Sequence, residues 1–479
     1  MNKKKRNIII NNEKKNQLQK IEYNKVMSSR QIQMIAIGGT IGSGLFLGSS
    51  NRLKIIGPLL IIIYLICGFF CFFIMRALGE LISYRPSSGS FISYSREFLG
   101  IKAGYFSGWI YFMNWVMTGI VDITAISLYM RYWYLFNHIP QWLFSLITIF
   151  IIGIINIIGV KWFAEIEFWL SFIKVLSIII FIIIGIFLLF NKYIFHFHYF
   201  LKKPIILAHN FFNKNGKYNI FPHGMWQSIL LTQGVIFSFA SIELIGITSE
   251  ECKNPKIILP KVINSVFWRI MFLYIGSISL LILLLPLSLY KRYESPFVTF
   301  LHILGIPYIN NIMNFIIITA ALSSLNSGLY SVGRILRSMA LDGVAPKILG
   351  YMNKNKVPYT SIISTLFIYI IGIYINYLFP NKIFEIFLNL ASLFVIISWI
   401  FILICQIQLR KAINQGKIKK IDYKMPGAPF TTWLTLTFLF FMCILIFLNY
   451  PDGTYATVYV LPIIFIILYL GWLNIRKNF

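Results

Sequence analysis

The sequence predicts an all-α integral membrane protein with twelve transmembrane helices, a five-plus-five inverted repeat with broken helices 1 and 6 plus two additional helices. Three observations support this fold class. Hydrophobic residues fill 58% of the 479 positions and charged residues only 12%, which excludes an ordinary soluble enzyme. Many apolar runs reach the roughly 18 residues that a membrane-spanning helix needs. Two of these runs, five spans apart, are interrupted by small and polar residues, as inverted repeats are.

The apolar runs divide the chain into twelve candidate spans. They cover 33–49, 58–82, 104–131, 142–160, 164–190, 226–249, 261–289, 309–341, 358–380, 383–409, 430–450 and 454–475. The loops between them are short, so we expect no soluble domain. The organisation is then a basic cytoplasmic tail (1–30), a core of spans 1–10 (31–409), a basic cytoplasmic loop (410–429), and spans 11–12 with a short tail (430–479).

The formal charge of +28 would suggest nucleic acid as the partner of a soluble protein. In this chain the positions of the basic residues explain the positive charge, because most Lys and Arg residues fall on the cytoplasmic side when the chain starts in the cytoplasm. This bias is the positive-inside rule. It predicts a multi-pass protein of the cytoplasmic (inner) membrane with both termini in the cytoplasm, in contact with lipid and not with nucleic acid. The external loop 191–224, with its five lysines, is the exception.

The first span contains four glycines in seven residues, from Gly38 to Gly44. Each glycine costs about 1 kcal/mol relative to alanine inside a helix. One interpretation is an unwound turn whose amides bind an anion such as a carboxylate, since lipid offers them no partner. The other is close helix packing through small residues. The candidate substrate-binding residues of this span are Gly38, Gly39, Thr40, Ile41, Gly42, Ser43 and Gly44.

The sixth span carries a matching interruption between Phe237 and Gly246, with the carboxylate of Glu243 inside it. Paired broken helices are typical of transporters whose site lies at mid-membrane. Phe237, Ser238, Ala240 and Glu243 are therefore further substrate-binding candidates.

Several charged residues fall within apolar segments, where a charge costs roughly 2.5–3.5 kcal/mol and needs a partner or a pathway. Lys174 lies seven residues after Glu167, on the same face of span five and about 10 Å further in. It either snorkels to the interface or exchanges protons as a buried ammonium. Asp122 in span three is either a structural partner or a substrate contact. Gating or structural charges are expected at Glu165, Glu167 and Glu251.

Two smaller patterns carry no chemistry. Four of the five cysteines lie within apolar segments, where packing explains them. The His196–His198 pair could bind a metal, but a solvated loop explains it as well. We therefore expect no metal and no cofactor, and the chain shows no nucleophile–base arrangement of an enzyme.

In span two, Arg76 and Glu80 are spaced to pair with each other.

Motifs at 38–46, 238–246, 251–255 and 326–330 resemble those of the amino acid–polyamine–organocation (APC) superfamily, specifically its bacterial amino-acid permeases. The similarity runs from about Arg30 to the C-terminus. It implies the five-plus-five fold with two extra helices, and uptake driven by the proton gradient. It also implies a coupling lysine in span five, matched by Lys174. The coupling-ion shell of span eight would fall near Ser323 and Ser324.

Within this family the chain looks most like the lysine-specific permease, through the stretches 114–122, 164–169, 266–270 and 342–346. We therefore predict proton-coupled uptake of L-lysine, with the substrate ammonium bound by Glu243 or Asp122. The alternatives are a permease or exchanger for another amino acid (aromatic, basic or neutral) and a membrane amino-acid sensor. A sensor usually needs a soluble output domain, and these tails are short.

Overall fold

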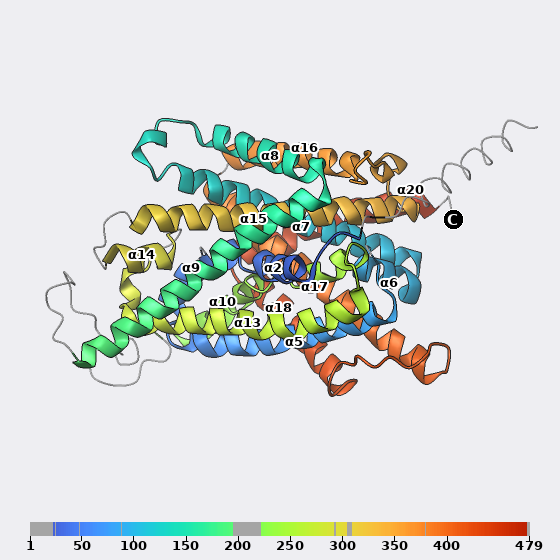
Figure 1. Cartoon of the computed structure of the whole chain (residues 1–479), viewed down its shortest axis with the longest axis horizontal. Helices are drawn as coiled ribbons and strands as arrows, with labels where there is room; N and C mark the ends of the chain where they lie inside the picture. Colours follow the sequence, from blue (N-terminus) through green and yellow to red (C-terminus); the bar gives the residue numbers. More distant parts are fainter. Residues whose placement is uncertain are drawn as a thin grey trace, which may run out of the picture.

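In the part of the chain that the computed structural model describes, the regular secondary structure is helical, with one isolated β-bridge between Met27 and Cys252. The helices lie alongside one another in one elongated bundle (Figure 1). The structure describes residues 23, 25–46, 48–87, 89–194, 222–291, 294–303, 309–378 and 380–476.

Each predicted span coincides with one helix or with a group of shorter ones. In chain order the elements are α2 (Ser29–Thr40), α3 (Ser43–Phe46), α4 (Gly48–Ile56), α5 (Leu59–Tyr84), α6 (Ser90–Leu99), α7 (Ile101–Met130), η1 (Tyr134–Phe136), α8 (Gln141–Ile158), α9 (Val160–Ile194), α10 (Met225–Leu231), α11 (Gln233–Phe237), α12 (Leu244–Ile247), η3 (Thr248–Glu250), α13 (Pro255–Leu284), η4 (Leu287–Leu289), α14 (Pro296–Ile303), α15 (Ile309–Leu341), η5 (Lys347–Gly350), α16 (Tyr359–Leu378), α17 (Pro380–Asn414), α18 (Phe430–Leu448), α19 (Asp452–Tyr455), η6 (Ala456–Val460) and α20 (Leu461–Arg476).

Within the described residues, nine helices are long and apolar enough to cross a membrane, or ten if the bent first span counts as one. Two further apolar helices, Met225–Phe237 and Tyr359–Ile375, are shorter. The all-helical membrane fold is therefore confirmed. The count of twelve spans and the inverted repeat stay predictions.

Both predicted interruptions are present. In the first span, α2 ends at Thr40, and the helix beyond the break is tilted by 41° relative to it. In the sixth span, α11 ends at Phe237 and α12 begins only at Leu244. Ser241 in that gap has a positive φ of 74°, a conformation that side-chain-bearing residues rarely adopt. A helix cannot continue through it.

The broken first span lies in the middle of the bundle. Figure 1 shows α2 end-on near the centre, and it packs against α9, α13 and α15. The glycines permit this position. A Cβ on Gly38 would lie 1.7 Å from the Ser171 hydroxyl of α9, and one on Gly39 would lie 2.5 Å from Leu244. Large apolar side chains such as Phe150, on α8, are exposed, as a lipid-facing surface requires.

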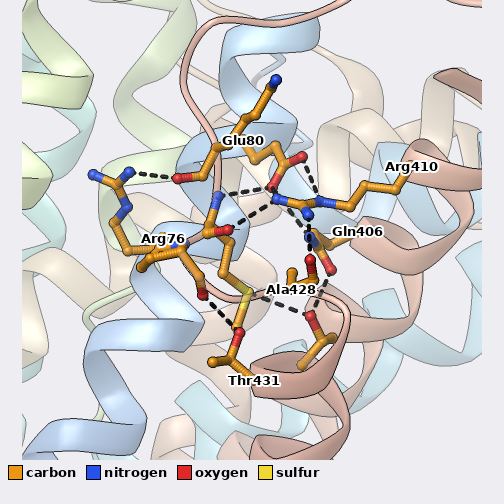
Figure 2. A network of polar contacts seen from close by, with 10 residues as sticks. Arg76, Glu80, Gln406, Arg410, Ala428 and Thr431 are labelled. Atoms are coloured by element: carbon orange, nitrogen blue, oxygen red, sulfur yellow. Dashed lines mark hydrogen bonds and ion pairs between the residues drawn. The ribbon is translucent and has the colours of Figure 1, made fainter. Parts of the chain in front are cut away.

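The loop 410–429 is bound back onto α5 by an ionic network (Figure 2). The Arg410 guanidinium, from the end of α17, donates to both carboxylate oxygens of Glu80 at 2.9 and 3.0 Å. Arg76 instead donates to Asn264 at 2.8 Å, and its guanidinium lies 4.0 Å from the centre of the Tyr423 ring. The predicted pairing of Arg76 with Glu80 is therefore wrong. A partner from a distant helix takes the carboxylate, and sequence spacing within one helix does not reveal such a partner.

Candidate functional site at the two broken helices

The ammonium of Lys174 lies at the broken end of the first span. Its Nζ donates to the carbonyl oxygens of Gly38 and Ile41, the latter at 2.9 Å. The last carbonyls of a helix have no intrahelical partner and carry partial negative charge, so a cation stabilises them. Lys174 is fully buried and reaches the break rather than an interface, which rules out snorkelling.

Glu167 lies seven residues earlier on the same helix, α9, about two turns away, and is also fully buried. Its carboxylate accepts hydrogen bonds from Ser171 at 3.2 Å, from Asn326 at 2.9 Å, and from the hydroxyl of Ser323. It also attracts the Lys174 ammonium electrostatically. The structure thus brings Lys174, Glu167 and Ser323 together beside the break. Their role in proton coupling stays a prediction.

The glycines of the first span serve close packing at three positions. Besides Gly38 and Gly39, Gly44 leaves no room for a side chain, because an added Cβ would lie 3.0 Å from the Cα of Ser238. Gly42 is different: its nearest neighbour would be Ser324, at an ordinary 3.4 Å. Its amide donates to the Thr40 carbonyl at 3.0 Å and is therefore occupied.

Gly42 is therefore set aside as a carboxylate-binding amide, and the amides of Ser43 and Gly44, which begin α3, remain candidates. Of the other candidates in this span, Thr40 donates its hydroxyl to Ala36 at 2.8 Å within α2, and Ile41 contributes its carbonyl to Lys174. The carboxylate site itself stays a prediction.

The two breaks are bridged by a tyrosine side chain. The Tyr274 hydroxyl, from α13, lies 2.6 Å from the carbonyl oxygen of Ser238 and 3.0 Å from that of Thr40. The Ser238 hydroxyl in turn lies 3.2 Å from the Tyr64 hydroxyl. One tyrosine therefore contacts the end of α2 and the start of the gap in span six.

A cavity of about 320 Å³ opens beside the breaks. This volume is at the lower end of the range for small-molecule sites, roughly 300–1,000 Å³. The buried guanidinium of Arg52, on α4, contacts the Gly44 carbonyl at 3.5 Å and the Ser238 hydroxyl at 3.4 Å. The cavity is lined by Gly44, Gly48, Asn51, Arg52, Ile55, Val121, Leu231, Gln233, Gly234, Glu385, Leu388, Asn389, Asn449, Tyr450, Pro451 and Asp452.

Glu243 has structural partners on both oxygens. It accepts a hydrogen bond from the Tyr111 hydroxyl of α7 at 3.2 Å and one from the Trp399 indole of α17 at 3.1 Å. Two helices thus hold this carboxylate at the break.

The other candidate carboxylate, Asp122, is fully buried in α7 and acts electrostatically on Lys174, whereas its neighbour Val121 lines the cavity. Neither carboxylate lines the cavity.

The remaining predicted residues lie around this centre. Phe237 and Ala240 are buried in the gap of span six. Phe237 packs on Gly44, where an added Cβ would lie 3.1 Å from its ring.

Two of the three predicted gating charges, Glu251 and Glu165, lie away from the breaks, whereas Glu167 lies beside the first one. Glu251 is buried and paired with Arg334 of α15 at 3.1 Å, and it accepts from the Tyr330 hydroxyl. The amide of Met27 donates to the carbonyl of Glu251 at 3.0 Å, so the segment before α2 covers this contact. Glu165, by contrast, is partly exposed and pairs with Arg30 at 3.3 Å.

Sequence reasoning missed Arg52, Tyr64, Tyr274, Gln233 and Asn389. Arg52 was missed because the predicted first span ended at Ser49. In the structure the broken span continues to Ile56, and the Arg52 side chain on this continuation is buried within the bundle. The polar residues were missed because a single tyrosine or amide in an apolar run carries no signal of its own. The described residues contain no group of three or more metal-binding side chains, and His196 and His198 lie outside them.

Comparisons with known proteins place the chain in a family. Residues 31–479 match the family model described as amino acid permease. The chain is 54% identical over 459 residues to the L-asparagine permease of Escherichia coli K12, which covers 95% of this chain and 89% of that protein. The chain belongs to the amino acid permease family, within the APC superfamily, and is a multi-pass amino-acid transporter.

Further relatives have the same name. The L-asparagine permease of Streptomyces coelicolor is 46% identical over 459 residues, covering 95% of this chain and 91% of that protein. L-asparagine permease 1 of Mycobacterium tuberculosis H37Rv is 43% identical over 456 residues, with the same two coverages.

The prediction of a lysine-specific permease is therefore not supported, and the structure explains why its motifs misled. Those stretches do not lie at the cavity, apart from Val121. Trp115 packs on Gly328, Trp268 is 68% exposed, and Asp342 is paired with Arg96. Residues that serve helix packing and surface contacts carry no information about the substrate side chain.

Proposed function

We propose that this chain is a secondary active permease that takes up L-asparagine across the cytoplasmic membrane, driven by the proton gradient, with both termini in the cytoplasm. The observation that supports L-asparagine as the substrate is the 54% identity, over 95% of the chain, to a protein named L-asparagine permease. The similarity to that protein includes the broken first and sixth spans that form the site.

The charges of the site support a neutral substrate side chain. Glu243 and Glu167 are each occupied by two or more hydrogen-bond donors from the protein. Glu385, at the cavity, interacts electrostatically with Arg52. Asp452 also lines the cavity, and both it and Glu385 already have interactions within the protein. Burying a charge without a partner costs several kcal/mol, so an ammonium would compete for carboxylates that are already engaged, and an uncharged carboxamide is favoured.

The contacts of Lys174 support proton coupling. Protonated, its ammonium makes charge-assisted hydrogen bonds to the end of α2, which are stronger than neutral ones. Loss of the proton removes the charge and weakens the attachment of α2 to α9. Movement of the first span would then depend on protonation at this nitrogen, with Glu167 as the adjacent acceptor.

Uptake of radiolabelled L-asparagine into proteoliposomes tests this function, with and without an inward proton gradient. We expect accumulation that needs the gradient and that excess unlabelled asparagine abolishes, whereas lysine does not compete. Competition by lysine at equal concentration would overturn the substrate proposal. Accumulation that needs internal amino acid rather than the gradient would indicate an exchanger.

A further inference from the structure

Two carboxamide side chains meet at the wall of the cavity. Gln233 opens α11 on the sixth span, and Asn389 lies on α17; both line the cavity and both are 95% buried. The Gln233 Nε2 donates to the Asn389 Oδ1 at 3.3 Å. The Oε1 of Gln233 has no hydrogen-bond partner among the described residues. A buried carbonyl oxygen without a donor is unfavourable, so a ligand that supplies one is stabilised.

The orientation of both amides is determined by the backbone. The Asn389 Nδ2 donates to the main-chain carbonyl of Glu385 at 2.8 Å. A carbonyl only accepts, so the nitrogen of Asn389 must face it and the oxygen must face Gln233. That oxygen also only accepts, so the nitrogen of Gln233 faces Asn389. This chain of three groups, which we call the amide relay (Glu385 carbonyl, Asn389, Gln233), leaves Gln233 with its oxygen unused.

We infer that the amide relay is the specificity-determining element for the substrate side chain, and that Gln233 Oε1 accepts a hydrogen bond from the carboxamide NH₂ of L-asparagine. This inference rests on the proposed function and assigns the residue that recognises its substrate. The adjacent residue Gly234 packs on Arg52, where an added Cβ would lie 2.7 Å from the guanidinium. The relay thus lies beside the cationic group that contacts both breaks.

The fixed orientation explains how asparagine is distinguished from aspartate, which has the same shape. The aspartate carboxylate has no donor, and it would place an oxygen against the Gln233 oxygen. Gln233 cannot rotate by 180° to offer its NH₂ without placing its oxygen against that of Asn389. L-leucine has the shape of asparagine without polar atoms and would leave the Gln233 oxygen unpaired. Sites built around a buried hydrogen bond discriminate strongly against ligands that lack it.

The test measures binding to the purified full-length chain in nanodiscs, with radiolabelled L-asparagine and with L-aspartate and L-leucine as competitors. Gln233→Met keeps the length of the side chain and removes the acceptor. We expect about tenfold weaker asparagine binding, with no loss for leucine. Gln227→Met is the matched control, because Gln227 is an exposed glutamine of the same span that does not line the cavity. It should change asparagine affinity by less than about twofold.

Asn389→Leu tests the orientation separately, because it releases Gln233 to rotate. Aspartate should then compete about tenfold better relative to asparagine, which a merely structural role of Asn389 would not produce. If Gln233→Met does not fold, the competition of aspartate relative to asparagine in Asn389→Leu tests the amide relay instead. Unchanged asparagine binding in Gln233→Met, or an unchanged ratio in Asn389→Leu, overturns the relay alone. If the wild-type chain does not bind asparagine, the proposed function and the relay both fail.

Discussion

At the scale of single residues, the site depends on where buried charges find partners. Lys174 is held by main-chain oxygens at a helix end, Glu167 by side-chain donors, and Glu243 by Tyr111 and Trp399. Each contact satisfies a group that neither lipid nor packed protein could otherwise accommodate. The charges predicted to bind the substrate are therefore mostly occupied by the protein itself, and Lys174 contacts the end of the broken first helix.

Lys174→Ala should abolish accumulation of asparagine above the external concentration, because no ammonium then links protonation to the end of α2. Gradient-driven uptake into proteoliposomes measures this. Lys161→Ala is the control, since Lys161 lies on the same helix with its side chain exposed, and it should accumulate normally. Normal, pH-dependent accumulation by Lys174→Ala would move the coupling role to Glu165 or Glu167.

Gly38→Ala should destabilise the protein, because the new methyl group would lie 1.7 Å from the Ser171 hydroxyl. Overpacking of this kind costs about 1–3 kcal/mol, which thermal unfolding of the detergent-purified chain detects. Gly350→Ala provides the comparison, because its methyl group would make an ordinary 3.6 Å contact. Equal melting temperatures for the two variants would show that α2 and α9 are not packed this closely.

At the scale of elements, the sixth span is anchored differently at its two sides. On the cavity side, the gap is held by hydrogen bonds to Tyr64 and Tyr274. On the other side, Glu251 is bound to Arg334, whose guanidinium lies 3.6 Å from the centre of the Tyr330 ring. This buried cluster ties the end of span six to α15, and Met27 closes over it.

Glu251→Ala should therefore destabilise the chain strongly, since it leaves the Arg334 guanidinium buried without its carboxylate. Breaking a buried pair costs about 3–5 kcal/mol, whereas an exposed pair contributes only about 0–1 kcal/mol. Glu165→Ala, which breaks the exposed pair with Arg30, should change thermal stability little. Similar losses in both variants would contradict the assignment of Glu251 as a buried anchor.

At the scale of the whole molecule, apolar run lengths predicted the helical membrane fold, the glycine cluster predicted the first break, and the small and polar residues of span six predicted the second. The sequence also predicted that Lys174 and Glu167 share a face, because that follows from helix geometry. It did not predict pairs between distant helices, such as Glu80 with Arg410 or Gln233 with Asn389, since nothing local encodes them. The lysine prediction is not supported by the relatives, and apart from Val121 its motifs lie outside the cavity.

The most direct test of the account is substrate-driven proton entry. Proteoliposomes containing the wild-type chain and a trapped pH-sensitive dye receive L-asparagine, L-lysine or no amino acid, with no gradient imposed. The account predicts that asparagine acidifies the lumen, that lysine has no effect, and that Lys174→Ala liposomes do not respond to asparagine. Acidification by lysine but not by asparagine, or a full asparagine response in Lys174→Ala, would contradict it.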